Sequence, residues 1–187
     1  IDVVFVGDEP SFAGAAQLAR DVAAALGVVP TGELLAERIA ADVEAKIAEI
    51  AEIAPTAEAD RVRMIFLYLR GASGIYYLFG EESGAGDLIR GLGGVDVAGE
   101  IGWTGLKPMT DEAIIAANPD LILVMTSGLE SAGGVDALLA AKPAIALTAA
   151  GQNQRFVDMA DGDILSFGPR SAAVLDALAR AVYAPAD

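Results

Sequence analysis

The sequence predicts an α/β fold in which a lobe built on a parallel sheet follows one long helix. From Arg61 onward, short apolar runs alternate with helical segments, which is the pattern of βαβ units. Before them, residues 33–53 repeat apolar side chains at three- and four-residue spacing, which is typical of an amphipathic helix. We therefore expect residues 59–187 to form the lobe, residues 30–58 to contain the long helix, and residues 1–29 to be an attachment in front of it.

The first 29 residues predict half of a βα layer. An apolar run, Ile1–Val6, is expected to be a strand, and a turn follows around residues 7–10. An Ala-rich helix is then expected from Phe12 to Leu26, where Gly27 ends it. The chain opens directly on the apolar run and has no initiator Met, so we expect it to be a piece of a longer protein.

The long helix has recognisable start and stop signals. Thr31 can cap its first turn and Pro55 follows its end. At about 1.5 Å per residue, the segment 33–53 would be roughly 30 Å long. A helix of this length between two unequal pieces of chain predicts a strut.

The remaining elements alternate between strands and helices. Thr110 is expected to cap a helix that Asn118 and Pro119 stop, and Pro169 suits a first helical position. The expected strands are Arg61–Leu69, a weaker one at Val95–Val97, Leu121–Met125, Ala144–Leu147 and Arg155–Met159. The expected helices are Gly84–Leu92, Asp111–Asn118, Val135–Ala141 and Pro169–Tyr183.

Composition excludes several chemistries. The chain has 12 Lys and Arg against 27 Asp and Glu, a formal net charge of −15, and neither Cys nor His. Ser-His-Asp and Cys-His nucleophiles, Cys/His zinc sites and disulfides are therefore excluded within this sequence. Nucleic acids and anionic membrane surfaces need clustered cations, so neither is an expected partner. No apolar run approaches the ~18 residues that a membrane span requires.

A Tyr-x-Arg pair follows the strongest strand. In open parallel sheets, ligands bind outside the carboxyl ends of the strands. Tyr68 and Arg70 stand at such an end and share one face, because the side-chain period of a strand is two. A guanidinium beside a phenol favours the phenolate, which is a hard oxygen ligand for ferric iron. The alternative is that Tyr68 is a half-buried core aromatic and Arg70 a solvated charge.

Two further residues are candidates for binding. Met125 ends the strand Leu121–Met125, where a thioether can pack on a flat apolar ligand or act as a soft metal ligand, although Met there is often only core filling. Trp103 is the only Trp, and it stands on a Gly-flanked loop before a capped helix. It could serve as a binding lid or as a packing anchor.

Phosphate binding and catalysis have little support. Residues 71–74 follow a strand and contain two Gly, but their spacing fits neither the dinucleotide fingerprint nor the Walker A loop. Residues 84–86 precede a helix without following a strong strand. The carboxylates are scattered along helices without a defensible acid and base pair. We therefore do not expect an enzyme, and a nucleotide-dependent Rossmann-like enzyme remains the least favoured alternative.

Four stretches together resemble a family, the haem-binding lipoprotein component of bacterial haemin ABC importers, and its actinobacterial branch in particular. These stretches are VRMIFLYLRGASGIYYLFG at 62–80, GDLIRGLGG at 86–94, LKPMTDEAIIAANPDLILVM at 106–125 and LSFGPRSAAVLDALARAVY at 165–183. The resemblance covers essentially the whole chain, and its most specific parts are Tyr-Leu-Arg-Gly and Phe-Gly-Pro-Arg.

The resemblance implies a fold and a set of ligand contacts. Such proteins have two α/β lobes joined by a long helix, and the ligand lies in the cleft between them. Residues 59–187 would then be a Rossmann-like C-terminal lobe, residues 30–58 the interlobe helix and residues 1–29 the end of the N-terminal lobe. By similarity, Tyr68 would ligate the iron of haem, with Arg70 as its hydrogen-bond partner and Met125 near the porphyrin. In this branch a His of the other lobe is the second ligand, and this sequence contains none.

The function that the resemblance implies is haem capture outside the cytoplasm and delivery to an ABC permease, with haem as the transported ligand. The full-length protein would be held at the cell surface by a lipid anchor that lies outside this sequence. Surface carboxylates would dock on the permease, and Glu81, Glu82 and Asp87 are the candidates. Ferric siderophores and corrinoids remain alternative cargoes. We also expect the exposed cleft face to favour self-association.

Overall fold

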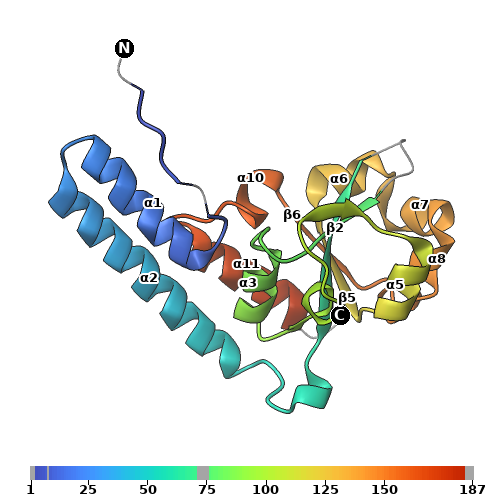
Figure 1. Cartoon of the computed structure of the whole chain (residues 1–187). Coiled ribbons are helices and arrows are strands. Elements are labelled where there is room, and N and C mark those ends of the chain that lie inside the picture. Colours follow the sequence, from blue (N-terminus) through green and yellow to red (C-terminus); the bar gives the residue numbers. More distant parts are fainter. Residues whose placement is uncertain (1–2, 8, 71–75, 184–187) are drawn as a thin grey trace.

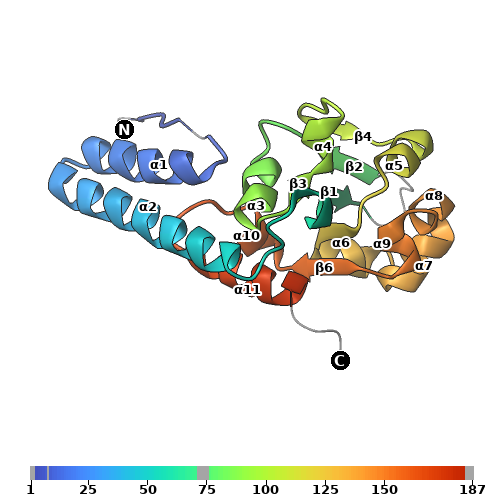
Figure 2. The same ribbon diagram turned by 90° about the horizontal axis from the view of Figure 1, so that it is seen from below.

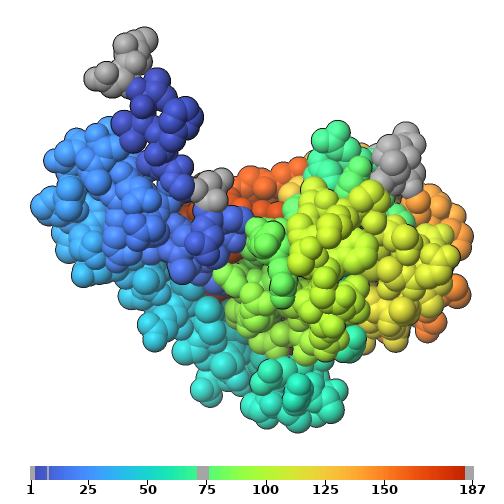
Figure 3. Space-filling view, in the orientation of Figure 1, coloured from blue at the N-terminus to red at the C-terminus, as the bar shows by residue number. Residues whose placement is uncertain are grey.

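The computed structural model describes residues 3–7, 9–70 and 76–183. A helical hairpin extends to one side of a lobe in which helices cover both faces of a sheet (Figures 1 and 2). In the space-filling view, the hairpin and the lobe are two masses that meet near α3 (Ala85–Gly91) (Figure 3). The predicted α/β class is confirmed.

The hairpin consists of α1 (Phe12–Ala25) and α2 (Val29–Ala51). Ser11 caps α1, because its hydroxyl accepts the N–H of Gly14 at 2.8 Å. A two-pronged ion pair joins the helices where Arg20 Nε and Nη2 each lie 2.9 Å from a carboxylate oxygen of Glu33. The later turns of α1 therefore lie beside the first turns of α2.

The predicted long helix is present, but it starts earlier than expected. α2 begins at Val29 with Pro30 in its first turn, so Thr31 lies inside the helix and the predicted Thr31 cap is wrong. Proline suits this position because the first N–H groups of a helix have no intrahelical partner. The other end of α2 packs on the lobe, where the Lys46 ammonium lies 3.0 Å from Asp176 in α11 (Ser171–Tyr183).

The strand expected at Ile1–Val6 is not formed by its described residues. Residues 3–6 have no regular structure, and Phe5 is 93% exposed. A strand needs a hydrogen-bonded neighbour, and no strand in the described part of the chain pairs with this segment. Ile1 and Asp2 lie outside the described residues.

The sheet is mixed and mainly parallel. Its main order is β4-β2-β1-β5-β6, with β3 beside the first residues of β1. β1 runs parallel to β3 and β5. β2 pairs antiparallel with β1, and β4 pairs antiparallel with β2; the sequence analysis predicted neither β2 nor β4. The strands are β1 (Arg63–Leu69), β2 (Tyr76–Phe79), β3 (Val95–Asp96), β4 (Leu106–Pro108), β5 (Leu121–Met125) and β6 (Phe156–Met159).

One expected strand is a helix. Residues 144–147 were predicted as a strand, but α8 (Pro143–Ala146) covers most of them, with Pro143 in its first turn and Ala144 and Ile145 buried. The other connections are α4 (Val97–Glu100), α5 (Asp111–Ala117), α6 (Thr126–Ser131), α7 (Gly134–Ala141), α9 (Ala149–Gln152), α10 (Asp161–Ile164) and the short 3₁₀ turn η1 (Glu58–Asp60).

Alternation along β1 divides the core between the two faces of the sheet. Met64 and Phe66 belong to the cluster under α2, α3 and α11, whereas Ile65 and Leu67 belong to the cluster under α5 and α8. No helix among the described residues combines the length and the apolar character needed to cross a membrane.

Candidate functional site

Tyr68 and Arg70 lie together at the carboxyl end of β1. Arg70 Nε donates to the phenolic oxygen of Tyr68 at 3.1 Å, and the guanidinium carbon is 5.6 Å from the centre of the Tyr68 ring. Tyr68 is half-buried and Arg70 is exposed. A charged donor therefore faces the oxygen that could ligate a metal, at an edge of the sheet that solvent can reach.

Tyr68 belongs to a row of side chains that crosses four strands on one face of the sheet. Tyr77 of β2 is its direct cross-strand partner, with the ring centres 6.3 Å apart. On the other side, Leu67 pairs with Val124, so Tyr68 stands beside Met125 one residue further on. Met125 pairs in turn with Met159 of β6. We call Tyr77, Tyr68, Met125 and Met159 the transverse row.

Two phenylalanines support the transverse row from below. Phe79 meets the Tyr68 ring edge to face, with 6.1 Å between the centroids. Phe79 also stacks on the fully buried Phe66 with 4.8 Å between the centroids. Phe66 belongs to the core cluster under α3 and α11. Packing of these rings therefore fixes the orientation of the Tyr68 ring, in addition to the hydrogen bond from Arg70.

The sequence analysis selected Tyr68 and Met125 as candidates, but not Tyr77, Phe79 and Met159. Residues 76–79 are aromatic or apolar at every position, so the pattern does not show that Tyr77 and Phe79 lie on the opposite face from Tyr76 and Leu78. Met159 also ended a predicted strand, as Met125 did, and the same rule about strand ends selects it.

Trp103 takes a different position. Its ring packs against the cluster on the opposite face of the sheet from Tyr68, and its carbonyl accepts the N–H of Glu81 at 3.0 Å. Its indole N–H is buried and has no hydrogen-bond partner in residues 3–7, 9–70 or 76–183. The structure does not bring Trp103 into the transverse row, so the packing-anchor interpretation fits this position better than a lid.

Two carboxylates accept hydrogen bonds from the two residues that directly follow β5. Asp158 accepts a hydrogen bond from the Thr126 hydroxyl at 2.6 Å, and Asp161 accepts both the hydroxyl and the N–H of Ser127. The hydrogen bond from the Ser127 hydroxyl lowers the pKa of Asp161. These contacts fix the first turn of α6 directly after Met125.

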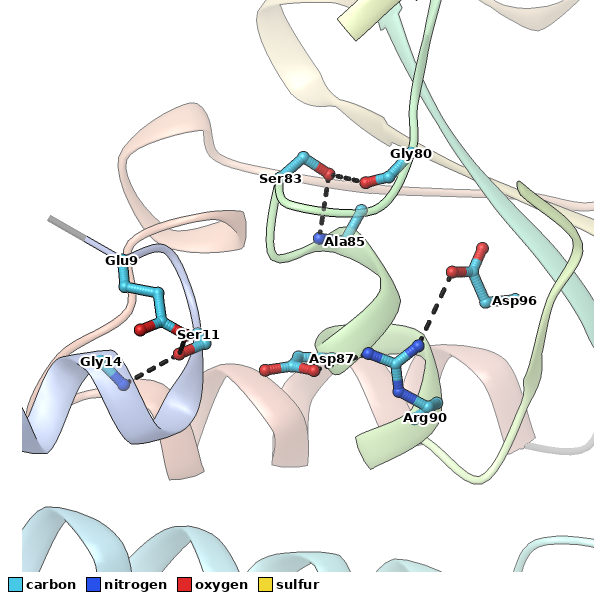
Figure 4. A network of polar contacts seen from close by, with 9 residues as sticks. All are labelled: Glu9, Ser11, Gly14, Gly80, Ser83, Ala85, Asp87, Arg90 and Asp96. Carbon is cyan, nitrogen blue, oxygen red and sulfur yellow. Dashed lines mark hydrogen bonds and ion pairs between the residues drawn. The ribbon is translucent and has the colours of Figure 1, made fainter. Parts of the chain in front are cut away.

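A second feature is an acidic pocket of about 270 Å³ between the start of α1 and α3. Among the residues that the structure describes, four carboxylates and one cation, Arg90, line it. Arg90 Nη2 lies 2.6 Å from Asp87, and Figure 4 shows its guanidinium between Asp87 and Asp96. The lining carboxylates are Glu9, Glu81, Glu82 and Asp87.

Asp96 is the buried member of this network. Its Oδ1 accepts the N–H of Ala98 at 3.1 Å and so caps α4, but its Oδ2 forms no hydrogen bond within the described part of the chain. Arg90 Nη1 is 3.9 Å from Oδ2, which is an ion pair but too far for a hydrogen bond. Burial raises the pKa of Asp96.

We predict that Asp96→Asn stabilises the fold at neutral pH. An acid with a raised folded-state pKa contributes stability below its unfolded pKa and loses it as the pH rises through the folded value. At pH 7 the ionised, incompletely bonded Asp96 is therefore a cost that a neutral Asn removes while keeping the α4 cap. Urea unfolding at several pH values checks this. A variant that is less stable than the parent at pH 7, or an advantage that persists at pH 3, would contradict it.

The described residues do not offer a conventional protein metal site. Within them, no three His, Cys, Asp or Glu side chains gather closely enough to hold a metal ion.

Comparisons with known proteins agree with this geometry. The family profile described as periplasmic binding protein matches residues 1–161. A crystal structure of the heme-binding protein HmuT is 40% identical, with a TM-score of 0.89, over 96% of this chain and 57% of that one. The periplasmic heme-binding protein RhuT from Roseiflexus sp. RS-1 is 39% identical, with a TM-score of 0.79, over 93% of this chain and 64% of that one.

A third structure, the periplasmic heme-binding protein BhuT in complex with two hemes, is 30% identical, with a TM-score of 0.81, over 94% of this chain and 64% of that one. The solved HmuT structures include variants in which a His, a Tyr, and an Arg two positions after that Tyr are each replaced by Ala. No curated protein matches the sequence.

The chain spans about three fifths of the length of these solved structures. Its fold matches part of a two-lobe binding protein, and this class works outside the cytoplasm. The prediction of a protein without catalysis is confirmed, because the matched family is non-enzymatic. The chain belongs to the periplasmic binding protein family.

Proposed function

We propose that this chain is part of a substrate-binding protein that captures haem and delivers it to an ABC importer, with Tyr68 as a ligand of the haem iron. The observation that carries the proposal is the hydrogen bond from Arg70 to the Tyr68 oxygen at the edge of the transverse row. In the whole protein, residues 59–187 would be the C-terminal lobe, residues 30–58 the interlobe helix and residues 1–29 the end of the other lobe.

The Tyr68 and Arg70 pair suits ferric iron. A phenolate is a hard anionic ligand, and a guanidinium that donates to its oxygen stabilises that anion. A partner that donates to a ligand atom also fixes its orientation and tunes the electron density at the metal. Arg70 would therefore set the strength of the bond between iron and Tyr68 without touching the iron.

The transverse row suits a flat apolar ligand. Four adjacent strands at about 4.8 Å spacing give a surface roughly 14 Å across. Aromatic rings and polarisable thioethers make favourable contacts with an extended π-system. In this proposal Met125 is a pocket residue, and Tyr77 and Met159 extend the surface to either side. Neither a ferric siderophore nor a corrinoid requires this combination of a phenol and a flat apolar row.

The relatives support haem over the other cargoes. Each of the three structures compared above is described as a heme-binding protein. The replaced Tyr and Arg of HmuT have the spacing of Tyr68 and Arg70. The replaced His of HmuT has no counterpart in this sequence, which contains no His. The second axial ligand would therefore come from outside residues 1–187.

Titration of the chain with haemin tests the proposal. We expect saturable binding and a high-spin ferric spectrum with a phenolate charge-transfer band. Iron-free protoporphyrin is the control for the apolar surface, and it should bind without that band. If a ferric siderophore or cobalamin binds this chain more tightly than haemin does in a competition titration, the cargo must be reassigned. If haemin causes no saturable change in this chain or in the longer protein that contains it, the haem proposal is wrong.

For Arg70→Ala we expect haem to remain bound with a perturbed spectrum. Loss of a group that donates to a metal ligand typically costs roughly 10- to 100-fold in metal affinity. The charge-transfer band should shift in energy because the phenolate loses its charged hydrogen-bond donor. Arg38→Ala, which removes an exposed Arg from α2, is the matched control. An Arg70→Ala complex with the parental spectrum and affinity would make Arg70 a surface charge only.

The permease is the partner that this function requires. Glu81, Glu82 and Asp87 were the predicted docking carboxylates, and all three line the acidic pocket together with Glu9. The surface that we propose for docking is therefore this pocket, and the groups that it would receive are Lys or Arg side chains of the permease. A lipid anchor at the cell surface also belongs to this proposal.

Self-association was predicted through the exposed cleft face, and we extend this proposal to the exposed apolar side chains of the hairpin. Leu26 and Leu34 are 71% and 68% exposed, and Leu26 lines an apolar groove of about 320 Å³ formed by α1, α2 and residues 167–169. Light scattering of the concentrated chain should detect dimers or larger species. Replacing both residues with Ser should shift the population towards the monomer, and a parental chain that stays monomeric would contradict this expectation.

A further inference from the structure

Arg90 stands between two carboxylates of unequal exposure. Its Nη2 lies 2.6 Å from Asp87, which is accessible from the acidic pocket, and its Nη1 lies 3.9 Å from Asp96, which is buried (Figure 4). The Arg90 side chain is 59% exposed, so a change of rotamer meets little steric resistance. One guanidinium therefore serves two acids and makes a short contact with only one of them.

The buried acid, Asp96, has an incomplete set of hydrogen bonds. The Asp96 side chain is 6% exposed, and its Oδ2 makes no hydrogen bond to any of the described residues. A buried carboxylate oxygen in this state is costly, because the ion pair with Arg90 at 3.9 Å and the nearby N–H of Gly99 replace only part of the water that it has lost. The backbone approaches it closely, since a Cβ added at Gly86 would lie 2.7 Å from Oδ2. Gly86 also lines the acidic pocket, so Asp96 lies directly behind the pocket wall.

The pocket in front of Asp96 has a surplus of negative charge. Glu9, Glu81, Glu82 and Asp87 face a single lining cation, Arg90. Asp87 is the only one of the four within salt-bridge distance of Arg90. A cation that enters the pocket would therefore compete with Arg90 for Asp87.

We propose that Arg90 is a displaceable counter-ion, which leaves Asp87 for the buried Asp96 when a cationic side chain of a partner binds in the acidic pocket. The proposal rests on the docking role of that pocket and adds a mechanism to it. The exchange keeps the number of ion pairs constant: the partner takes Asp87, and the Arg90 guanidinium turns its second arm to Asp96 Oδ2. Asp96 thereby gains the donor that it lacks, which offsets the loss of the contact between Arg90 and Asp87.

The experiment uses a tri-arginine peptide with blocked ends as the probe, titrated into the full chain by calorimetry at low salt. Arg90→Met removes the internal competitor and keeps the side-chain length, so we expect tighter binding by up to about fivefold, the size of one exposed ion pair. Asp96→Asn keeps the α4 cap but removes the alternative partner of Arg90, so we expect weaker binding by a similar factor.

The double variant separates an exchange from a simple change in net charge. If Arg90 moves to Asp96, then Asp96→Asn has no effect on peptide affinity once Arg90 is Met, because the residue that would use Asp96 is gone. Long-range electrostatics instead predicts that the two effects add. Additive effects, or a parental chain that does not bind the peptide saturably, would overturn the proposal.

Control measurements separate the exchange from general effects of charge and from misfolding. Glu100→Gln removes one negative charge from α4, close in sequence to Asp96, and should change peptide affinity less than Asp96→Asn does. Near-UV circular dichroism establishes that each variant is folded. Haemin affinity should be the same in all of them, so failure of the haem proposal and failure of the Arg90 exchange are seen in separate measurements.

Discussion

Tyr68→Phe is expected to abolish the phenolate charge-transfer band of the haemin complex and to leave the fold intact. The substitution removes only the oxygen, and the ring keeps its contacts with Tyr77 and Phe79. Loss of a group that merely supports a ligand costs roughly 10- to 100-fold in metal affinity, so loss of the ligand itself should cost at least about 100-fold. Visible spectroscopy and haemin titration measure both effects.

Tyr77→Phe is the matched control for this prediction. Tyr77 faces Tyr68 across the strand pair and has the same side chain, but it lacks the short contact with Arg70. Its variant should keep the charge-transfer band and most of the affinity. A Tyr68→Phe complex that retains the parental spectrum would remove Tyr68 from the iron site, and loss of the band in Tyr77→Phe alone would reassign the ligand to Tyr77.

Phe66→Ala is expected to give the largest loss of stability. Phe66 is fully buried in the middle of β1, where it stacks on Phe79 at 4.8 Å. Deleting a buried aromatic ring removes its transfer free energy and leaves a cavity, which together cost about 3–5 kcal/mol in the free energy of unfolding. Urea denaturation followed by circular dichroism measures this loss.

The same substitution should also weaken haem binding, because Phe79 would lose the ring that supports it beneath Tyr68. Phe66→Leu is the conservative control, and it should cost less than about 1.5 kcal/mol because most of the volume is kept. If Phe66→Ala unfolded at the parental urea concentration, the packing described for this face of the sheet would be wrong.

Local chemistry made several elements predictable. Thr110 caps α5 as expected, since its hydroxyl accepts the N–H of Ala113 at 3.2 Å. Asn118 ends that helix in the left-handed conformation, with a φ of 40°, before Pro119. The expected helix at Pro169–Tyr183 appears as Ser171–Tyr183, so Pro169 lies before the helix and the first helical position predicted for it is wrong. At each end of α5 a single residue caps or ends the helix, so that signal is contained in the local sequence.

The misassigned elements depend on partners that are distant in sequence. β2 is apolar on both faces, because Tyr76 and Leu78 enter one core cluster while Phe79 packs against the other, so it shows no alternation of apolar and polar residues. The run at 144–147 is apolar because α8 packs on the sheet, and a short buried helix and a short buried strand have the same pattern.

The candidate site was likewise predictable only where it depends on local sequence. Tyr68, Arg70 and Met125 could be selected because strand ends are visible in the sequence. That Tyr68 lies beside Met125 and Tyr77 could not be, because it depends on strand order and register. Trp103 was selected for its flanking Gly residues, and these do not specify which face of the sheet its ring joins.

The pairing of Met125 with Met159 has a consequence for oxidation chemistry. Both thioethers are only partly buried and lie in register on the face that we assign to haem. Peroxide generated near an iron porphyrin would convert them to sulfoxides, which are polar and chiral. Two neighbouring strands would then present polar groups where a flat apolar surface is needed, so peroxide would weaken haem retention and methionine sulfoxide reductases would restore it. If the face binds haem as we propose, oxidation of Met125 and Met159 would therefore be a chemical mark of exposure to peroxide at the site.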